Sequence, residues 1–334
     1  MCGEASVAWR SATRAASEGW PRIGMTWAYA VSSKTLTSGG IIMSFEPTVS
    51  NPETATPLTP VEVHPRELLE GENRSIAEIE AIGRQIRVAF PPRSRDLEQD
   101  EEWFVFDAGE GWQEMRLHDY DALFPVQGLY ERVVYDVFRC DSPPVIRDLL
   151  GEAVDAGEID PLRARVLDLG AGNGHMAARL REIGFRHFVG VDLSSPAREA
   201  AERDFPSLYR AYAVGDLLNL PPEEAPKVDD EPFQAMTCVA ALGFGDIPPS
   251  VFAAAVNRVE DGGKIVFTLR SDFVDTDDRS GFAGLISALV ERDAFTDLRR
   301  KSYTHRINAA GVPIEYTAFC ATKTRDITPD EIPA

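Results

Sequence analysis

The residues best placed to do chemistry lie in one stretch, 166–175, which reads VLDLGAGNGH. It begins as an apolar run typical of a buried parallel strand, with the acid Asp168 inside it, and continues with glycines at alternate positions, Gly170, Gly172 and Gly174. Glycines let the backbone approach a ligand closely, and a helix that starts after the last of them offers unpaired N–H donors in its first turn. The pattern therefore predicts a nucleotide-binding corner made of a strand, a turn and a helix.

Acidic residues recur where the following strands should end. The second predicted strand ends in Asp192 and the third is followed by Asp216, while the fourth, 233–239, carries Cys238 near its end. An acid about 20 residues beyond a glycine turn is placed to accept hydrogen bonds from ribose hydroxyls. Since open α/β sheets bind ligands at the carboxyl ends of their strands, we expect these residues and Asp168 to face one ligand.

The spacing of the glycines separates two classes of ligand. A dinucleotide fingerprint has glycines at its first, third and sixth positions, whereas here the third glycine, Gly174, is at the fifth position and His175 is at the sixth. With Asp168 ahead of the first glycine, the stretch resembles motif I of the class I S-adenosylmethionine-dependent methyltransferases. The turn 260–263 (EDGG) resembles the glycine–glycine turn before the fifth strand of that family, with Asp261 where the family usually has proline.

The resemblance covers about residues 160–323, and the segments 241–248 and 266–270 resemble the small methyltransferases of the Williams–Beuren-region type. It implies an α/β fold with a Rossmann-like, doubly wound sheet of seven strands, mostly parallel and with the last strand antiparallel. We place that domain at 158–325. An N-terminal extension of helices and a hairpin, which we call the cap, should precede it over 65–157.

The resemblance also implies the activity. The enzyme would transfer the methyl group of S-adenosyl-L-methionine to an acceptor, the glycine turn would pass under the methionine moiety, and Asp216 would hold the adenine amino group. The residues expected to bind the cofactor are Asp168, Gly170, Ala171, Gly172, Gly174, Asp192, Leu193, Asp216, Leu217, Cys238 and Tyr130. For Cys238, a place in the core of its strand is a simpler interpretation than a nucleophilic thiolate.

The elements of the cap follow from local patterns. Isoleucines at three- and four-residue spacing predict an amphipathic helix over 75–88. Two apolar runs within 103–117 flank a glycine-containing loop and predict a hairpin. Two helices should follow, one over 127–139 and one over 142–156, the latter capped by Ser142.

The acceptor side offers fewer candidates. His118 and Tyr120 come directly after the hairpin, where a histidine can serve as a general base. We expect the segment 112–139 to close over the cofactor, with these two residues and Tyr130 nearest the methyl group, and Arg270 to complete the catalytic set. The alternative is a purely stabilising extension, in which His118 is a hydrogen-bonded turn residue.

Composition limits the partners. The chain has 54 acidic against 34 basic residues and a formal net charge of −20, which disfavours a nucleic acid as acceptor and leaves a small molecule as the expected one. No apolar run reaches the roughly 18 residues of a membrane span, so no membrane partner is expected. The 4 cysteines are scattered without a C-x-x-C pair, which argues against a metal site and fits the cytoplasm. The sequence indicates neither the identity of the acceptor nor an oligomeric state.

The N-terminal residues 1–64 are expected to form a disordered tail, since 44–62 is rich in Pro, Thr, Glu and Ser. Order should begin near Pro65. Residues 1–42 have a basic balance, and two hypotheses apply to them: a transit peptide, or upstream sequence that is not translated, with Met43 as the true start.

Two other functions share parts of this pattern. A nicotinamide-dependent oxidoreductase would use the same corner, although the glycine spacing opposes it. A catalytically silent module would bind the cofactor and transfer no methyl group, and the absence of turnover on a cellular extract would identify it.

Overall fold

The computed structural model of the chain describes residues 31–37, 40–45, 75–90, 101–242, 247–274 and 281–332. They belong to two compact units, Met1–Glu46 and Pro47–Ala334. In the first unit, β1 (Val31–Thr37) and β2 (Gly40–Phe45) form an antiparallel pair where we expected part of a disordered tail. β-branched residues, which favour extended backbone, recur in both strands and account for the difference. The other parts of 1–64 lie outside the described residues.

The second unit is built on a seven-stranded sheet. Its strands in chain order are β6 (Arg165–Leu169), β7 (His187–Asp192), β8 (Tyr209–Val214), β9 (Phe233–Cys238), β10 (Val259–Arg270), β11 (Phe295–Ile307) and β12 (Pro313–Lys323). They lie in the order β11-β12-β10-β9-β6-β7-β8. The five strands from β10 to β8 are mutually parallel, and β12 runs antiparallel to both of its neighbours. The predicted fold class is confirmed.

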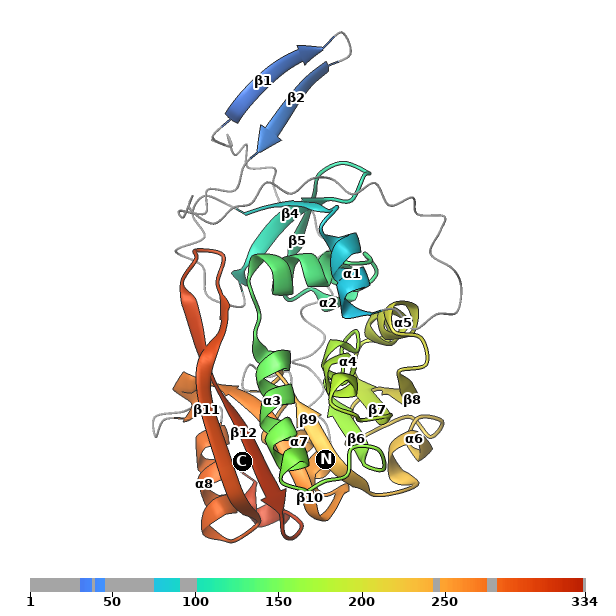
Figure 1. Cartoon of the computed structure of the whole chain (residues 1–334), viewed down its shortest axis with the longest axis vertical. Coiled ribbons are helices and arrows are strands. Elements are labelled where there is room, and N and C mark those ends of the chain that lie inside the picture. Colours follow the sequence, from blue (N-terminus) through green and yellow to red (C-terminus); the bar gives the residue numbers. More distant parts are fainter. Residues whose placement is uncertain are drawn as a thin grey trace, which may run out of the picture. The chain divides into compact units, whose positions relative to one another are not determined.

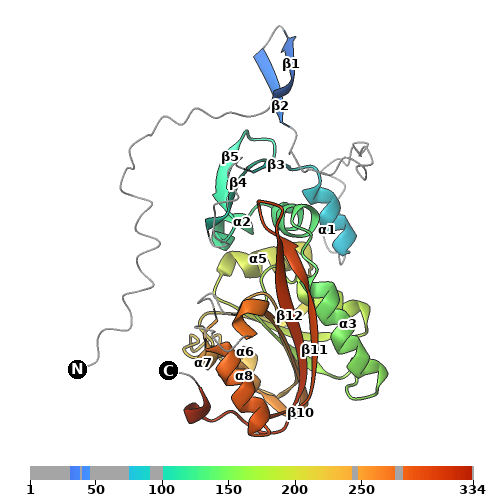
Figure 2. The ribbon, with the colours of Figure 1, turned by 90° about the vertical axis from the view of Figure 1, so that its left-hand side faces the viewer.

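Helices cover both faces of this sheet (Figure 2). One face carries α3 (Ser142–Asp155), α4 (His175–Glu182) and α5 (Ser195–Asp204), and the other carries α6 (Pro226–Asp229), α7 (Pro249–Val256) and α8 (Phe282–Glu291). Alternate residues of β6 point to opposite faces: Val166 packs with α3 and α4, whereas Leu167 and Leu169 pack with α7 and α8. A central parallel strand is therefore apolar on both faces. None of the described helices has the length and apolar character needed to span a bilayer.

The cap lies at the carboxyl ends of the parallel strands (Figure 1). Its elements are α1 (Ile76–Gly83), β3 (Arg87–Ala89), β4 (Trp103–Asp107), β5 (Gln113–Arg116), α2 (Tyr120–Leu123) and the π-helix η5 (Glu131–Val137). The predicted hairpin is confirmed as β4–β5, and β3 adds a third antiparallel strand. The helix predicted over 127–139 is present over its central part, as η5.

The helix predicted over 75–88 ends early, at Gly83. A Cβ on Gly83 would lie 2.3 Å from the carbonyl oxygen of Gly128, so the end of α1 packs directly against the backbone ahead of η5. Residues 87–89 then pair with β4. The backbone groups of 87–89 make their hydrogen bonds with β4 and not within a continued helix.

The helix α3 joins the cap to the sheet. Ser142 does not cap it as predicted, because the Ser142 hydroxyl is bonded to Nδ1 of His305 (2.7 Å) and to the hydroxyl of Tyr303 (2.5 Å) on β11. α3 packs on the sheet, although the predicted boundary at 157 placed it with the cap. The backbone N–H of Ile307 donates to the carbonyl of Phe138 (2.9 Å), so the β11–β12 hairpin lies beside the chain that leads from η5 into α3 (Figure 1).

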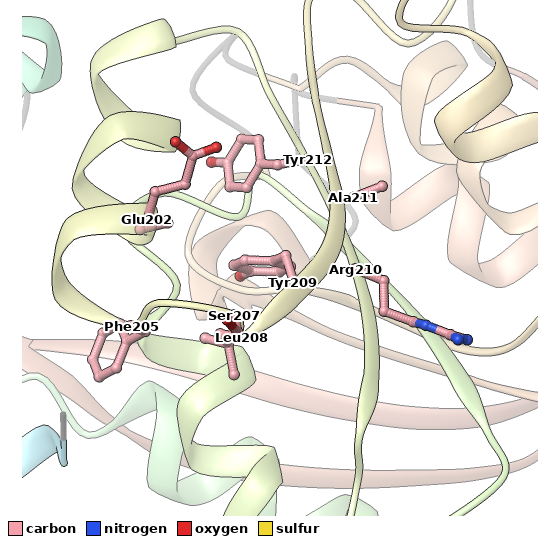
Figure 3. Close-up of a pocket in the computed structure, with 9 residues that line it drawn as sticks. Glu202, Phe205, Ser207, Leu208, Tyr209, Arg210, Ala211 and Tyr212 are labelled. Carbon is pink, nitrogen blue, oxygen red and sulfur yellow. The ribbon is translucent and has the colours of Figure 1, made fainter. Parts of the chain in front are cut away.

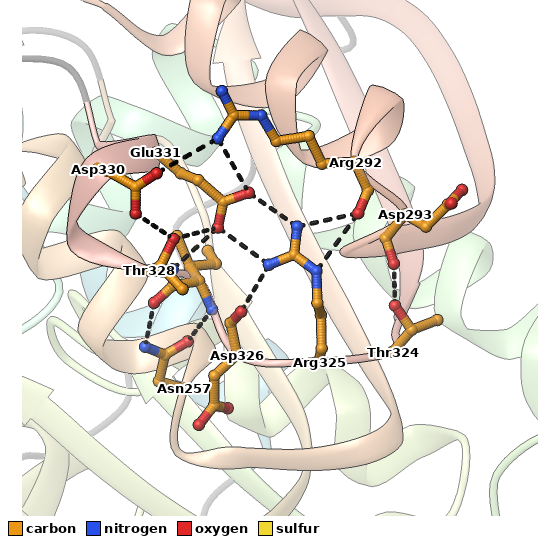
Figure 4. Close-up of polar contacts among 10 residues, drawn as sticks. Asn257, Arg292, Asp293, Thr324, Arg325, Asp326, Thr328, Asp330 and Glu331 are labelled. Carbon is orange, nitrogen blue, oxygen red and sulfur yellow. Dashed lines mark hydrogen bonds and ion pairs between the residues drawn. The ribbon is translucent and has the colours of Figure 1, made fainter.

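The residues after β12 are tied back to the domain, beyond the predicted boundary at 325 (Figure 4). Arg325 donates two hydrogen bonds to Glu331 (2.7 and 2.9 Å), the last residue of the short helix η7 (Pro329–Glu331), and these bonds lower the pKa of Glu331 to about 2. Asn257, which follows α7, accepts from the backbone N–H of Ile327 (2.7 Å) and donates to its carbonyl (2.9 Å). The folded domain therefore continues through Glu331.

Candidate active site

The glycine turn joins β6 to α4 at the carboxyl edge of the sheet. Gly170, Gly172 and Gly174 have φ values of 70°, 52° and 88°, a region that residues with a side chain rarely adopt. An added Cβ would also lie 3.1 Å from Ala241 at the first of these positions and 3.1 Å from Tyr209 at the last. The turn thus needs its glycines both for conformation and for space, and its backbone, partly accessible at Gly170 and Gly172, can form a cradle for a ligand.

The end of β7 holds this turn. The carbonyl of Val191 accepts from the N–H of Gly170 (2.8 Å), and the carboxylate of Asp192 accepts from the N–H groups of Gly172 (2.8 Å) and Ser194 (2.9 Å). Burial raises the pKa of Asp192, and the backbone donors oppose that rise. A carboxylate has about four acceptor positions, so the predicted pair of ribose hydroxyls can be accommodated beside the two backbone donors.

Asp168 lies inside the sheet and is only 2 % exposed. Its Oδ1 accepts from the hydroxyl of Thr237 on β9 (2.7 Å), and its Oδ2 accepts from the hydroxyl of Tyr209 on β8 (2.7 Å). Burial raises the pKa of Asp168 to about 6, against the effect of these two donors. Asp168 therefore links the end of β6 to β8 and β9 by hydrogen bonds. Any contact of this residue with the cofactor has to use its remaining acceptor positions.

Two tyrosines that the sequence interpretation missed support the turn from β8. Tyr209 holds Asp168, and the hydroxyl of Tyr212 donates to the carbonyl oxygen of Gly172 (2.7 Å). Figure 3 shows both rings on the side of β8 that faces α5, where they line a cavity of about 130 Å³. The conformation of the glycine turn thus depends on side chains from two neighbouring strands as well as on its own glycines.

Asp216 and Leu193 lie farther along the same edge. Asp216 is half-buried and accepts from the backbone N–H of Leu218 (3.0 Å) and from the side chain of Asn219 (2.8 Å). Leu193 is exposed directly after β7. Both positions are accessible to a ligand that lies across the ends of β7 and β8.

The other residues predicted to bind the cofactor are buried. Ala171 lies under the turn, and Leu217 and Cys238 belong to the core between the sheet and α7. Burial raises the pKa of Cys238 well above its usual range, which opposes a thiolate at this position. Contacts of Leu217 and Cys238 with a cofactor would have to come from their backbone groups.

The cap brings an aromatic cluster to the glycine turn. The ring centroids of His118 and Tyr120 are 5.8 Å apart, Tyr120 stacks on Phe124 at 5.8 Å, and Phe124 lies 5.2 Å from Tyr130. The Cζ atom of Phe124 would be 3.4 Å from a Cβ on Gly172. Two of the three predicted catalytic residues, His118 and Tyr120, thus lie together with Tyr130, which we expected to bind the cofactor. Phe124, which the sequence interpretation missed, joins them to the turn.

Arg270 lies elsewhere along the edge of the sheet. It ends β10, two strands away from β6, and its guanidinium pairs with Asp272 (2.8 Å) in the short helix η6 (Ser271–Val274). Within the part of the chain that the structure describes, no three His, Cys, Asp or Glu side chains form a group that could hold a metal ion.

Polar contacts fasten the cap over the turn and over α5. The side-chain amide of Asn173, in the turn, donates to the buried carboxylate of Glu131 on η5 (2.5 Å), and Gln127 donates to Asp204 on α5 (3.0 Å). The sequence interpretation missed Glu131 and Asn173. For Glu131 the available signal was an acid within the apolar stripe of a predicted helix, near Val134.

Comparison with known proteins agrees with this geometry. The sequence model of a family described as a methyltransferase domain matches residues 143–311. The chain is 30% identical over 157 residues to methyltransferase-like protein 27 of Homo sapiens, and the aligned segment covers 47% of this chain and 58% of that protein. It is 29% identical over 140 residues to a ubiquinone biosynthesis O-methyltransferase of Alkalilimnicola ehrlichii, with coverages of 36% and 53%. The chain spans about half the length of these curated relatives.

The solved structures that match this chain include methyltransferases. A TehB-like SAM-dependent methyltransferase from Corynebacterium glutamicum is 20% identical, with coverages of 52% of this chain and 86% of that chain and a TM-score of 0.34. Magnesium protoporphyrin IX methyltransferase from Synechocystis, solved with bound SAM, is 12% identical, with coverages of 59% and 83% and a TM-score of 0.39. Because the family model matches half of this chain, the chain belongs to the class I S-adenosylmethionine-dependent methyltransferases, and S-adenosylmethionine is its cofactor.

Proposed function

We propose that the enzyme methylates a small molecule that binds between the cap segment 112–139 and the carboxyl ends of the strands. The observation that carries this proposal is the aromatic cluster of His118, Tyr120, Phe124 and Tyr130, which packs against the glycine turn from the cap side. A cofactor lying along that turn would present its methyl group to these rings.

The cofactor would lie across the ends of β6, β7 and β8. The glycine turn passes under its methionine moiety, Asp192 accepts from the two ribose hydroxyls, and Asp216 accepts from the adenine amino group. The cradle of positive-φ glycines supports the first contact. The acceptor positions that Asp192 keeps beside its two backbone donors support the second.

The bound cofactor supplies an electrophilic methyl group on a sulfonium centre. The residues of this chain orient the acceptor, exclude water and remove a proton where the acceptor must lose one. His118 is the base in this proposal, and a hydroxyl proton of the acceptor would pass to its ring. The rings of Tyr120 and Phe124 suit a cationic neighbour, since an aromatic face carries partial negative charge.

The acceptor atom would be the oxygen of a hydroxyl group on a small aromatic ring. A planar ring can stack on the aromatic cluster, which favours this class of compound. Two of the curated relatives are named ubiquinone biosynthesis O-methyltransferases, which supports an oxygen acceptor. The net charge of −20 disfavours RNA and DNA.

Transfer of a labelled methyl group tests this function. The full chain is incubated with methyl-labelled S-adenosylmethionine and a cell extract separated into small-molecule, RNA and protein fractions, with a Gly172→Val variant as the inactive control. Label should enter the small-molecule fraction. In a second assay, with hydroxylated aromatic compounds supplied one at a time, label should enter at least one of them. Label confined to RNA or protein would refute the acceptor class. Binding of S-adenosylhomocysteine without label in any fraction would favour the catalytically silent module.

A further inference from the structure

We infer that Glu131 of the cap is a positioning residue that fixes the cofactor-binding turn through Asn173. The Nδ2 amide of Asn173 donates to Oε1 of Glu131 at 2.5 Å, and the two residues are 3 % and 1 % exposed. This assignment rests on the proposed cofactor site, since Asn173 lies in the turn that would pass under the methionine moiety.

The turn depends on outside contacts for its shape. Asn173 stands between two glycines that both have positive φ, where the backbone has wide conformational freedom. From the side of the sheet, Asp192 binds the N–H of Gly172 and Tyr212 binds its carbonyl. From the side of the cap, Glu131 binds the side chain of Asn173. The turn is thus held on both sides, and the cap supplies one of the two supports.

A buried carboxylate at this position is costly for folding. Glu131 begins η5, and Val133 and Val134 on the same helix are also buried. Removing a carboxylate from water is unfavourable unless hydrogen bonds compensate, and an apolar side chain of similar volume would avoid that cost. The π-helical geometry is also common at functional sites. An acid that sits among apolar neighbours and points at the cofactor turn favours a role in positioning over a role in stability.

The surrounding groups set the charge of Glu131. From α5 it faces Asp204 and Arg203, and from its own helix the tyrosines at 130 and 135. On α4, His175 stacks on Tyr135 at a centroid distance of 3.9 Å. Burial, and then repulsion by Asp204, raise the pKa of Glu131 to about 7, while burial lowers the pKa of His175 to about 3 and keeps that ring neutral. The hydrogen bond from Asn173 therefore becomes charge-assisted as the pH rises through neutrality.

Reciprocal substitution in the full chain tests the pair. Asn173→Asp sets two carboxyl groups against each other, and its affinity for S-adenosylhomocysteine at pH 8 should fall about tenfold or more, with partial recovery at pH 6. Adding Glu131→Gln to this variant restores one donor and one acceptor in the reverse direction and should recover most of the affinity. Asp136→Asn, which changes an exposed acid of the same π-helix, is the matched control and should bind as the wild type does.

Calorimetry and thermal melting, read together, give clear outcomes. Recovery of affinity in the double variant supports the positioning role. An Asn173→Asp variant with wild-type affinity, or a folded double variant that binds no better than Asn173→Asp alone, overturns it. A wild-type chain that does not bind S-adenosylhomocysteine overturns the proposed cofactor site itself, which is a separate result.

If Asn173→Asp does not fold, the pH dependence of the affinity for S-adenosylhomocysteine tests the positioning role of Glu131. The wild-type affinity for S-adenosylhomocysteine should rise about threefold between pH 6 and pH 8, as Glu131 ionises and its hydrogen bond strengthens. Glu131→Gln cannot titrate at this position, so its affinity should change less over the same range. The same pH dependence in both proteins overturns the assignment.

Discussion

The cofactor side and the acceptor side of the site are held by different means. On the cofactor side, Val191 and Asp192 at the end of β7 bind backbone N–H groups of the glycine turn, so the sheet itself sets the geometry. On the acceptor side, rings of the cap meet by packing, and contacts such as Gln127–Asp204 fasten the segment to α5. The first side should be sensitive to any change in the turn. On the acceptor side, substitutions of the rings should lower activity and leave the stability of the fold nearly unchanged.

The largest effect is expected for Gly172→Val, which attacks the cofactor side directly. A valine would have to adopt a φ of 52°, and its Cβ would lie 3.4 Å from the ring of Phe124. Affinity for S-adenosylhomocysteine, measured by calorimetry, should fall more than about a hundredfold. Gly157→Val is the matched control, because Gly157 also has positive φ but nothing lies within 4 Å of an added Cβ. Binding by Gly172→Val within about threefold of the wild type would contradict the cradle.

Asp192→Ala should have the next largest effect. It removes two charge-assisted hydrogen bonds to the ribose, each worth about 1.5–3 kcal/mol, so the dissociation constant should rise about a hundredfold or more. Thermal melting shows whether the variant still folds, since Asp192 also binds Gly172 and Ser194. An unchanged dissociation constant in a folded variant would count against the ribose assignment.

The acceptor side is tested by His118→Ala and Tyr120→Phe. Turnover should fall about tenfold or more in His118→Ala, because the base is lost, and less in Tyr120→Phe. Affinity for S-adenosylhomocysteine and the melting temperature should stay close to the wild-type values, since Phe124 is the ring of this cluster that lies beside Gly172 and both variants keep it. Wild-type turnover in both variants would leave the segment as a stabilising extension.

The smallest expected effect is on the pH dependence of the melting temperature of Glu131→Gln. The pKa of Glu131 is raised from its usual 4.5 to about 7 in the folded chain, so its contribution to stability is complete below the unfolded pKa and is lost as the pH rises through 7. Glu131→Gln lacks this penalty. Its melting temperature, relative to that of the wild type, should rise by a few degrees between pH 5 and pH 8. Asp136→Asn should show no such trend, and a difference that stays constant with pH would contradict the shifted pKa of Glu131.

The strand–turn–helix unit formed by β6, the glycine turn and α4 could be predicted from the sequence because its signals are local. The alternate glycines and Asp192 follow from spacing within one strand–turn–helix unit and the next strand, and the order of the strands follows from the apolar runs that separate them. These features depend on few contacts between distant parts of the chain. The assignment of Asp192, Asp216 and the glycines to the cofactor remains a prediction that the binding experiments test.

The sequence could not predict the supports of that turn. Tyr209 and Tyr212 are an odd number of residues apart, so a regular strand would place them on opposite faces. The pairing shifts between Phe188–Tyr209 and Val189–Ala211, which puts an extra residue in β8 and turns both tyrosines to one side. A bulge of this kind has no signal in hydrophobic periodicity.

Contacts between distant segments were missed for the same reason. Glu131 and Asn173 are 42 positions apart, and local spacing does not indicate that they meet. Ser142 fits the pattern of a helix cap, yet the fold brings it to His305 and Tyr303, 163 and 161 positions away. For Ser142, hydrogen bonds to distant residues outweigh the local preference for a helix cap.

A crystal structure of the full chain with S-adenosylhomocysteine tests the central claim most directly. We expect the ribose hydroxyls to bind the carboxylate of Asp192 and the sulfur atom to lie within about 4–5 Å of the rings of Tyr120, Phe124 or Tyr130. A ribose bound away from Asp192, or a sulfur atom that faces Arg270 with the aromatic cluster out of contact, would contradict it.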